Sequence, residues 1–164
     1  MLCGECEGEE KRASREKGLG FLVNGTIDVH NPRYRSLLEE CLARIPSSGR
    51  PVHLRTEVRL RRRGNLPGVV GLTTYYVEGY APNGIATEES GAHTITFYTN
   101  LMDKLTDRAV VAVMAHEFAH AWLNEHLRPE ASETRENDAD MLAEMWGFED
   151  ELAALAEQTE PVIC

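Results

Sequence analysis

The sequence lacks an excess of positive charge. Its 27 acidic residues outnumber 17 lysines and arginines, which gives a formal net charge of -10 at pH 7. A protein that binds nucleic acid needs a basic surface, so this balance argues against that class. The one basic run, RTEVRLRRR at 55–63, alternates with other residues as the solvent face of a strand does. We therefore expect no nucleic-acid partner.

Long apolar segments are missing as well. No stretch approaches the roughly 20 apolar residues of a transmembrane helix. Residues 1–12 contain no apolar core, so we do not expect a secretory signal there. With 42% hydrophobic and 27% charged residues among 164, the composition is typical of a soluble globular domain. We expect a cytoplasmic protein without a membrane partner.

Cysteine is scarce and unevenly placed. The four cysteines are Cys3, Cys6, Cys41 and Cys164. Without a secretory signal, structural disulfides are not expected. CGEC at 3–6 is half of a zinc knuckle, but a closed zinc site needs four ligands, and the second half is not visible. We expect residues 1–18 to be a flexible tail with a lone CxxC, or the remnant of an upstream zinc module. Residues 19–164 should form a single domain.

The first half of the chain predicts one helix and several strands. NPRYRSLLEECLARI at 31–45 has apolar residues at helical spacing, with Asn31 as a candidate N-cap and Pro32 at the first helical position. Its expected buried stripe is Tyr34, Leu37, Leu38, Cys41, Leu42 and Ile45. Alternating or β-branched segments predict strands at 52–60, 69–80 and 93–100, with a loop at 81–92.

The second half predicts helices. Thr106 can cap a strongly apolar helix over 107–127, and Ser132 can cap a helix over 133–146 that Gly147 ends. A short helix at 149–158 follows. The pattern predicts an α+β domain: a small antiparallel or mixed sheet packed on the long helix, with further C-terminal helices.

The long helix carries the motif HExxH. Residues four apart share one helical face, so His116 and His120 can bind the same zinc ion. Glu117, between them, can accept a proton from a zinc-bound water whose pKa the metal lowers towards 7. Two histidines and a carboxylate in an apolar helix are costly without a function. The motif therefore predicts one catalytic zinc ion.

Two residues compete for the third ligand position. His126 stands ten residues after His116, as in HExxHxxGxxH, but Leu123 occupies the place of the glycine that turns the chain. A continuous helix would rotate His126 about 80° away from His116. Glu136 is the better candidate, because Asp140 lies one turn later on the same face. Asp140 can accept the second ring N–H of a ligand histidine, and we expect that histidine to be His116.

These residues resemble the gluzincin zinc peptidases, of which thermolysin is the best-known member. AHEFAHAWL at 115–123 and ENDADMLAEMW at 136–146 are most similar to the peptidase domain of the plant DA-type organ-size regulators, which also carry LIM modules. The likeness spans roughly residues 30–148. ENDADMLA is also similar to the third-ligand segment of ImmA/IrrE-type peptidases. The resemblance implies a zincin-like fold and a zinc endopeptidase that cleaves a specific intracellular protein.

The resemblance further implies substrate binding along an edge strand of the sheet, and we expect 93–100 to be that strand. A tyrosine or histidine should stabilise the transition state. The sequence offers five candidates for that role: Tyr76, Tyr80, His93, Tyr98 and His126. A zinc-stabilised interaction module without turnover is the alternative function. Glu117 favours the enzyme, because zinc binding alone does not require it.

Overall fold

The computed structural model describes residues 25–49, 55–64, 67–77, 91–126 and 135–158. Predictions that concern Cys3, Cys6, Cys164, Tyr80 and the Ser132 cap lie outside these residues. So do the tail at 1–18 and most of the expected loop at 81–92. In chain order the structure contains the following elements: β1 (Gly25–Asp28), α2 (Pro32–Arg44), the 3-10 turn η1 (Ser47–Gly49), β2 (Arg55–Arg61), β3 (Gly71–Val77), β4 (Gly91–Tyr98), α3 (Thr99–Met102), α4 (Asp107–His126), α5 (Arg135–Met145) and α6 (Glu149–Gln158).

The predicted helix caps of α2 and α4 are present. Asn31 Oδ1 accepts hydrogen bonds from the backbone N–H groups of Arg33 and Tyr34 at 3.0 and 3.3 Å. Thr106 Oγ1 accepts one from the backbone of Ala109 at 3.4 Å. The six predicted apolar residues of the α2 stripe are all buried. Local sequence therefore set the start of both helices and the buried face of α2.

Gly147 ends α5 as expected. Its φ of +95° lies in the left-handed region that favours glycine. The backbone N–H of Phe148 then returns to the carbonyl of Ala143 at 3.1 Å, which closes the helix end. This turn directs the chain from α5 into α6 and buries Phe148 completely.

The four strands form one mixed sheet in the order β1-β2-β4-β3. β1 pairs with β2 in parallel, β2 pairs with β4 in parallel, and only β3 and β4 are antiparallel. The α+β class with a mixed sheet is thus confirmed. β1 was not predicted, because its four residues are too few to show a period.

The prediction that strand 93–100 is an edge of the sheet is wrong. β4 is bonded to β2 on one side and to β3 on the other, so its backbone groups are already paired. Its bounds also differ, since it begins at Gly91 and ends at Tyr98. Thr99 begins the short helix α3, where the Asp103 N–H bonds to the Thr99 carbonyl at 2.9 Å. Among the strands that the structure describes, β3 is the edge on this side of the sheet.

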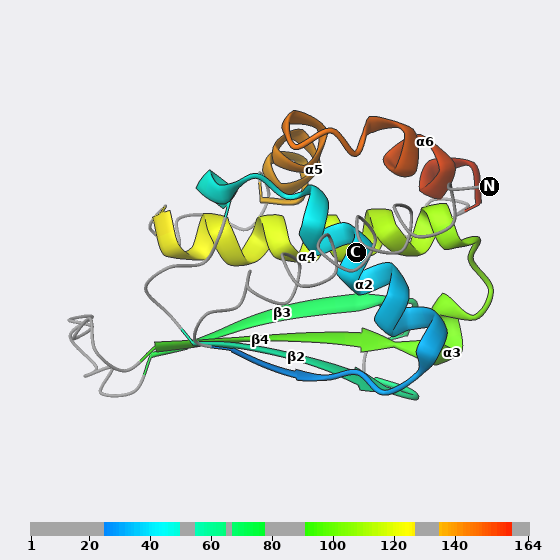
Figure 1. The fold of residues 1–164 in the computed structure, drawn as a ribbon, viewed down its shortest axis with the longest axis horizontal. Coiled ribbons are helices and arrows are strands. Elements are labelled where there is room, and N and C mark those ends of the chain that lie inside the picture. The colour runs from blue at the N-terminus through cyan, green and yellow to red at the C-terminus, as the bar shows by residue number, and fades with distance from the viewer. Residues whose placement is uncertain (1–24, 50–54, 65–66, 78–90, 127–134, 159–164) are drawn as a thin grey trace, which may run out of the picture.

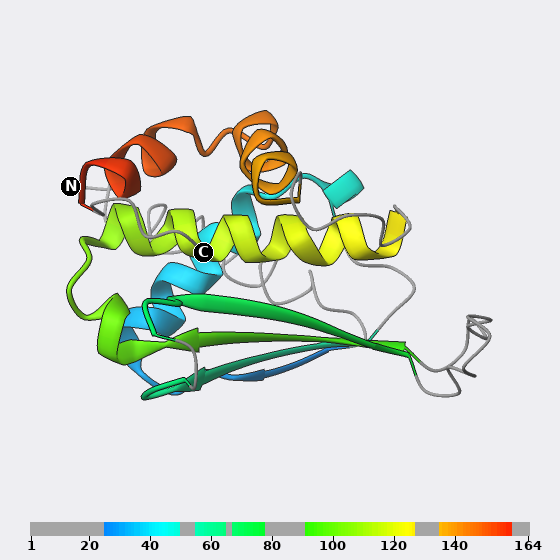
Figure 2. The same ribbon diagram turned by 180° about the vertical axis from the view of Figure 1, so that it is seen from behind.

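The helices gather on one side of the sheet (Figure 1). α4 runs along the sheet and contacts β3 and β4, while α5 and α6 pack on its opposite side. Figure 2 shows the same order from behind, with α4 between the sheet and the last two helices. α4 is therefore covered on both sides, which explains why residues 109–115 are all buried.

The other face of the sheet carries the basic run. Val58 of β2 is fully buried towards the helices, and Arg59 and Arg61 alternate with it on the outer face. Arg59 Nε donates to Thr96 Oγ1 at 3.0 Å. Arg61 Nη1 lies 3.6 Å from Asp28 Oδ2. The arginines thus line a solvent face, as the alternation predicted.

Among the described helices, none is long and apolar enough to cross a bilayer.

Candidate metal centre

The two histidines of HExxH lie side by side on α4. Their rings are perpendicular, with centroids 4.6 Å apart, and the two Nε2 atoms are separated by 3.0 Å. Both side chains are mostly buried, at 17% and 15% exposure. This arrangement follows from the four-residue spacing, which places both rings on one face of the helix. The helix alone therefore directs two nitrogen donors at one point.

Glu136 of α5 completes a cluster of three donors. Its Oε2 lies 3.0 Å from His116 Nε2, and its Oε1 lies 3.0 Å from His120 Nε2. The docking of α5 on α4 brings it there, through small buried residues at the contact, Ala119 and Ala139 among them. His116, His120 and Glu136 are the one described group of residues close enough together to hold a metal ion.

Asp140 contacts the other nitrogen of the first histidine. Its Oδ1 lies 2.8 Å from His116 Nδ1, and its side chain is 51% exposed. Glu136 and Asp140 are one turn apart on α5, so they reach the two sides of the same imidazole ring. In the charged ring both nitrogens donate, Nδ1 to Asp140 and Nε2 to Glu136; in a neutral ring Nδ1 would keep its proton for Asp140 and leave the Nε2 lone pair for a metal ion. The sequence predicted this pairing of Asp140 with His116.

These contacts change the charge state of the metal-free cluster. Burial by itself would lower the pKa of His116, but hydrogen bonds to Asp140 and Glu136 outweigh it and raise the pKa to about 10. Hydrogen bonds from His116 and from His120 to the Glu136 carboxylate hold the pKa of that group far below its usual value. In the metal-free chain the imidazolium and the carboxylate therefore stabilise each other.

Glu117 lies beneath this cluster, against the edge strand. It is buried, and burial raises the pKa of its carboxyl group, against the lowering effect of His116 and Thr73. Thr73 Oγ1 of β3 lies 2.6 Å from Glu117 Oε2 and 3.0 Å from the Glu117 carbonyl oxygen. A Cβ built on Gly71 would lie only 2.8 Å from Glu117 Cγ. Two residues of β3 thus touch the acidic residue of the motif.

Sequence reasoning did not find Gly71 or Thr73. Both precede Glu117 by more than 40 residues, so no helical or strand period connects them to it. One signal was available: a glycine inside a strand often marks a close approach of another group. Gly71 in VVGLTTYY is such a glycine, and the group that approaches it is Glu117.

The other candidate residues do not join the cluster. His126 Nδ1 donates to the Trp122 carbonyl oxygen at 2.9 Å, and its ring stacks on Trp122 with centroids 4.1 Å apart. Tyr98 alternates with the inward-facing Phe97 and lies over Gly64, on the face of the sheet away from α4. The side chains of Tyr76 and His93 are outside the described residues.

The donor set suits zinc. Zinc bonds of about 2.0–2.1 Å at a tetrahedral angle place neighbouring donors about 3.3 Å apart. The two Nε2 atoms are 3.0 Å apart and each lies 3.0 Å from one oxygen of Glu136, so a small outward movement accommodates the ion. Two imidazole nitrogens and one carboxylate leave a fourth position open, as catalytic zinc sites require. Fold and site together define a metallopeptidase-type centre.

Comparison with protein families agrees with this class. The family model "Peptidase family M48" matches residues 75–158, which is just over half of the chain and includes α4, α5 and α6. The chain belongs to peptidase family M48, whose members are metallopeptidases and typically depend on zinc. No curated protein and no solved structure matches the chain.

Proposed function

We propose that this chain is a zinc-dependent endopeptidase that holds one zinc ion through His116, His120 and Glu136. One observation carries the proposal: the Nε2 atoms of the two histidines are 3.0 Å apart, and each lies 3.0 Å from one carboxylate oxygen of Glu136 on the next helix. HExxH followed by a glutamate on the next helix is the gluzincin arrangement in a zincin-like fold. Asp140 would orient His116 through Nδ1 and keep it in the ligand tautomer.

Glu117 is the proposed general base. When bound, zinc would supply a water molecule of lowered pKa and polarise the scissile carbonyl. Glu117 would accept the proton of the attacking water and pass it to the leaving amine. Its buried position supports this role, because a buried carboxyl group is costly unless its environment or its function compensates.

We propose that the substrate binds along β3 rather than along β4. The side of β3 that faces away from β4 has no strand partner among the described residues, so its backbone groups are available to an extended peptide. Gly71 and Thr73 of this strand touch Glu117, so a peptide bound there would pass close to the base. The expected substrate is a segment of an intracellular protein, and we propose a cytoplasmic location.

Membership in family M48 does not decide between the two more specific resemblances that the sequence suggests. The resemblance of 115–123 and 136–146 to the plant DA-type regulators, and of 136–143 to ImmA/IrrE-type peptidases, stays a prediction. A zinc-stabilised interaction module without turnover is the competing function. It accounts for His116, His120 and Glu136 but assigns no role to Glu117.

The Glu117→Gln variant separates the two functions. Wild-type protein should bind one zinc ion and hydrolyse fluorescein-labelled casein. Glu117→Gln should keep the zinc and the fold but lose at least about 100-fold in rate, because only the proton acceptor is removed. The matched control is Glu144→Gln, the same change at an exposed position of α5 that should leave activity intact. Full zinc content with no hydrolysis by wild type would favour the interaction module.

A further inference from the structure

Two residues of the edge strand, Gly71 and Thr73, contact Glu117 from below. They are two positions apart on β3, so both face the helical side of the sheet. The register supports this, since they pair with Phe97 and Ile95, which are fully buried under the helices. β3 therefore presents one small residue and one hydroxyl group to the motif on α4.

The hydroxyl group of Thr73 is placed to fix one carboxylate oxygen. At 2.6 Å from Glu117 Oε2 it can donate a short hydrogen bond, which is charge-assisted when the carboxyl group is ionised. The Glu117 carbonyl oxygen at 3.0 Å is the second acceptor within its reach. With Oε2 held in this way, Oε1 is the oxygen left to receive a proton.

Gly71 allows the carboxylate to lie where it does. An alanine Cβ there would come within 2.8 Å of Glu117 Cγ and within 3.1 Å of Cδ and Oε1. Contacts under 3.0 Å force a displacement, and the crowded atom is in the middle of a buried side chain. Glycine at 71 thus gives Glu117 room, while Thr73 restricts its rotation.

We propose that Thr73 is a positioning residue for Glu117, and that Gly71 provides the space this position requires. The inference rests on the proposed function and adds to it two residues outside HExxH. It also connects the substrate strand to the base, because the strand that would pair with the peptide is the strand that holds Glu117. Because β3 would contact both the peptide and Glu117, it would fix the position of the peptide relative to the base.

The test compares Thr73→Val, Thr73→Ser and Gly71→Ala with wild type. Valine keeps the branched shape without the hydroxyl, serine keeps the hydroxyl, and alanine at 71 displaces Glu117 without touching Thr73. The probe is a quenched fluorescent peptide selected from a mixed library for cleavage by wild type. Zinc content is measured for every variant, to separate an effect on Glu117 from an effect on the three metal-binding residues.

The expected pattern is a fall in kcat of about 10- to 100-fold for Thr73→Val and Gly71→Ala, with KM and zinc content unchanged. Thr73→Ser should lie close to wild type. The control is Thr56→Val, since Thr56 is buried in β2 on the same face and its hydroxyl has no hydrogen-bond partner among the described residues. This control should leave kcat unchanged.

Three results of these kinetic and zinc measurements would overturn the inference. They are wild-type kcat in Thr73→Val, equal losses in the serine and valine variants, and loss of zinc from the valine variant. A crystal structure gives a test that does not need hydrolysis. Glu117 should occupy one conformation in wild type and several in Thr73→Val, and an unchanged single conformation would also overturn it. If wild type cleaves nothing, the proposed function fails, and this structural comparison still decides the role of Thr73.

Discussion

The two helices that form the site hold their side chains in different surroundings. α4 is covered on both sides, and its three site residues are buried or nearly so. On α5 the side chains of Glu136 and Asp140 are 47% and 51% exposed, and the helix buries only Ala139 and Ala143 fully. The same metal centre is thus formed by a core helix and a surface helix.

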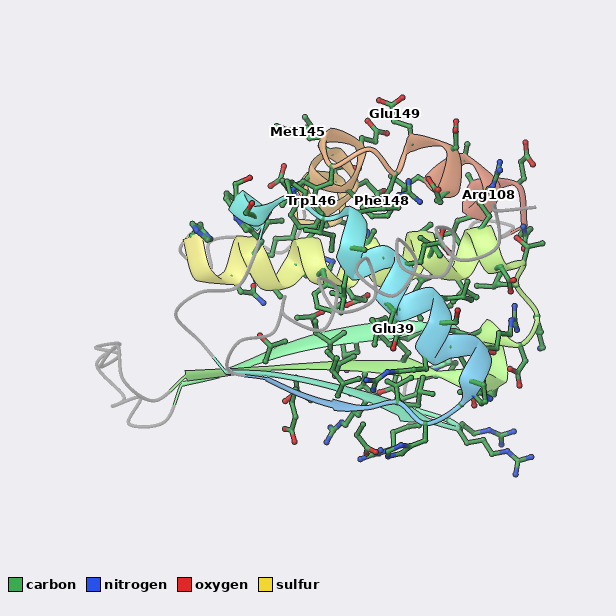
Figure 3. All side chains as sticks on the ribbon, viewed as in Figure 1. Glu39, Arg108, Met145, Trp146, Phe148 and Glu149 are labelled. Carbon is green, nitrogen blue, oxygen red and sulfur yellow. The ribbon has the colours of Figure 1, made fainter. Side chains whose placement is uncertain are left out.

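The surface character of α5 extends past the site. Met141 and Met145 are its large exposed apolar side chains, and Figure 3 shows Met145 and Glu149 on the outer side of the helical layer. Trp146 and Phe148 lie inward and join the core. The comparison teaches that changes on α5 should affect the metal more than the fold, while α4 serves both at once.

The largest effect expected on α5 is that of Glu136→Ala. The variant should lose more zinc affinity than the roughly 10–100-fold typical of an outer partner, because it removes a ligand. Its thermal stability without metal should fall modestly, because the variant loses the hydrogen bonds of Glu136 to His116 and His120, whose contribution is reduced by the half-exposed position. Isothermal titration calorimetry with zinc measures the affinity, and scanning calorimetry without zinc measures the melting temperature. His126→Ala is the control, and a weaker zinc site in that variant instead of in Glu136→Ala would refute the assignment of the third ligand.

A smaller effect is expected for Asp140→Ala. It removes the partner of His116 Nδ1, so zinc affinity or activity should fall about 10- to 100-fold, while the protein stays folded. Asp138→Ala provides the matched control, because two residues along a helix place it about 200° around the axis from Asp140. Equal losses in both variants would mean that the acidic helix acts only through its total charge.

The pH dependence of the zinc-free protein tests the same contacts. The pKa of His116 is raised from 6.5 to about 10, so its contribution to stability is complete below about pH 6.5 and is lost as the pH rises towards 10. The pKa of Glu136 is lowered, so its contribution is present above about pH 4.5 and is lost at lower pH.

Zinc should remove the alkaline part of this dependence, because a ligand histidine is neutral. We expect the melting temperature of the zinc-free protein to fall between about pH 7 and pH 10, and that of the zinc-loaded protein to fall less. Melting curves with and without a chelator across this range give the comparison. Parallel curves would show that His116 is not charged in the metal-free cluster.

The smallest expected effect is a change in stability in the sheet, away from the site residues of α4 and α5. Thr56→Val replaces a buried hydroxyl group that has no hydrogen-bond partner among the described residues. Removing it should raise the free energy of unfolding by about 1 kcal/mol, because the buried group no longer lacks a partner. Chemical denaturation measures the change. A clear loss of stability would show that this hydroxyl has a partner in solution.

The sequence by itself determined the parts of the site that lie within one helix. His116, Glu117 and His120 are related by the helical period, and so are Glu136 and Asp140. Their relative positions need no knowledge of the fold. The pairing of the two sets was predicted from chemistry, since a glutamate ligand and a partner for the second ring nitrogen suit a histidine pair.

The tertiary structure decided everything that depends on which strands pair. β4 has the composition of a strand, but composition does not show whether both its edges are bonded, and here they are. The short strand β1 and the contact of Gly71 and Thr73 with Glu117 also depend on segments that are distant in the sequence. They arise because the chain brings β3 beneath α4, across more than 40 residues of sequence, and only packing of the whole domain fixes such non-local contacts.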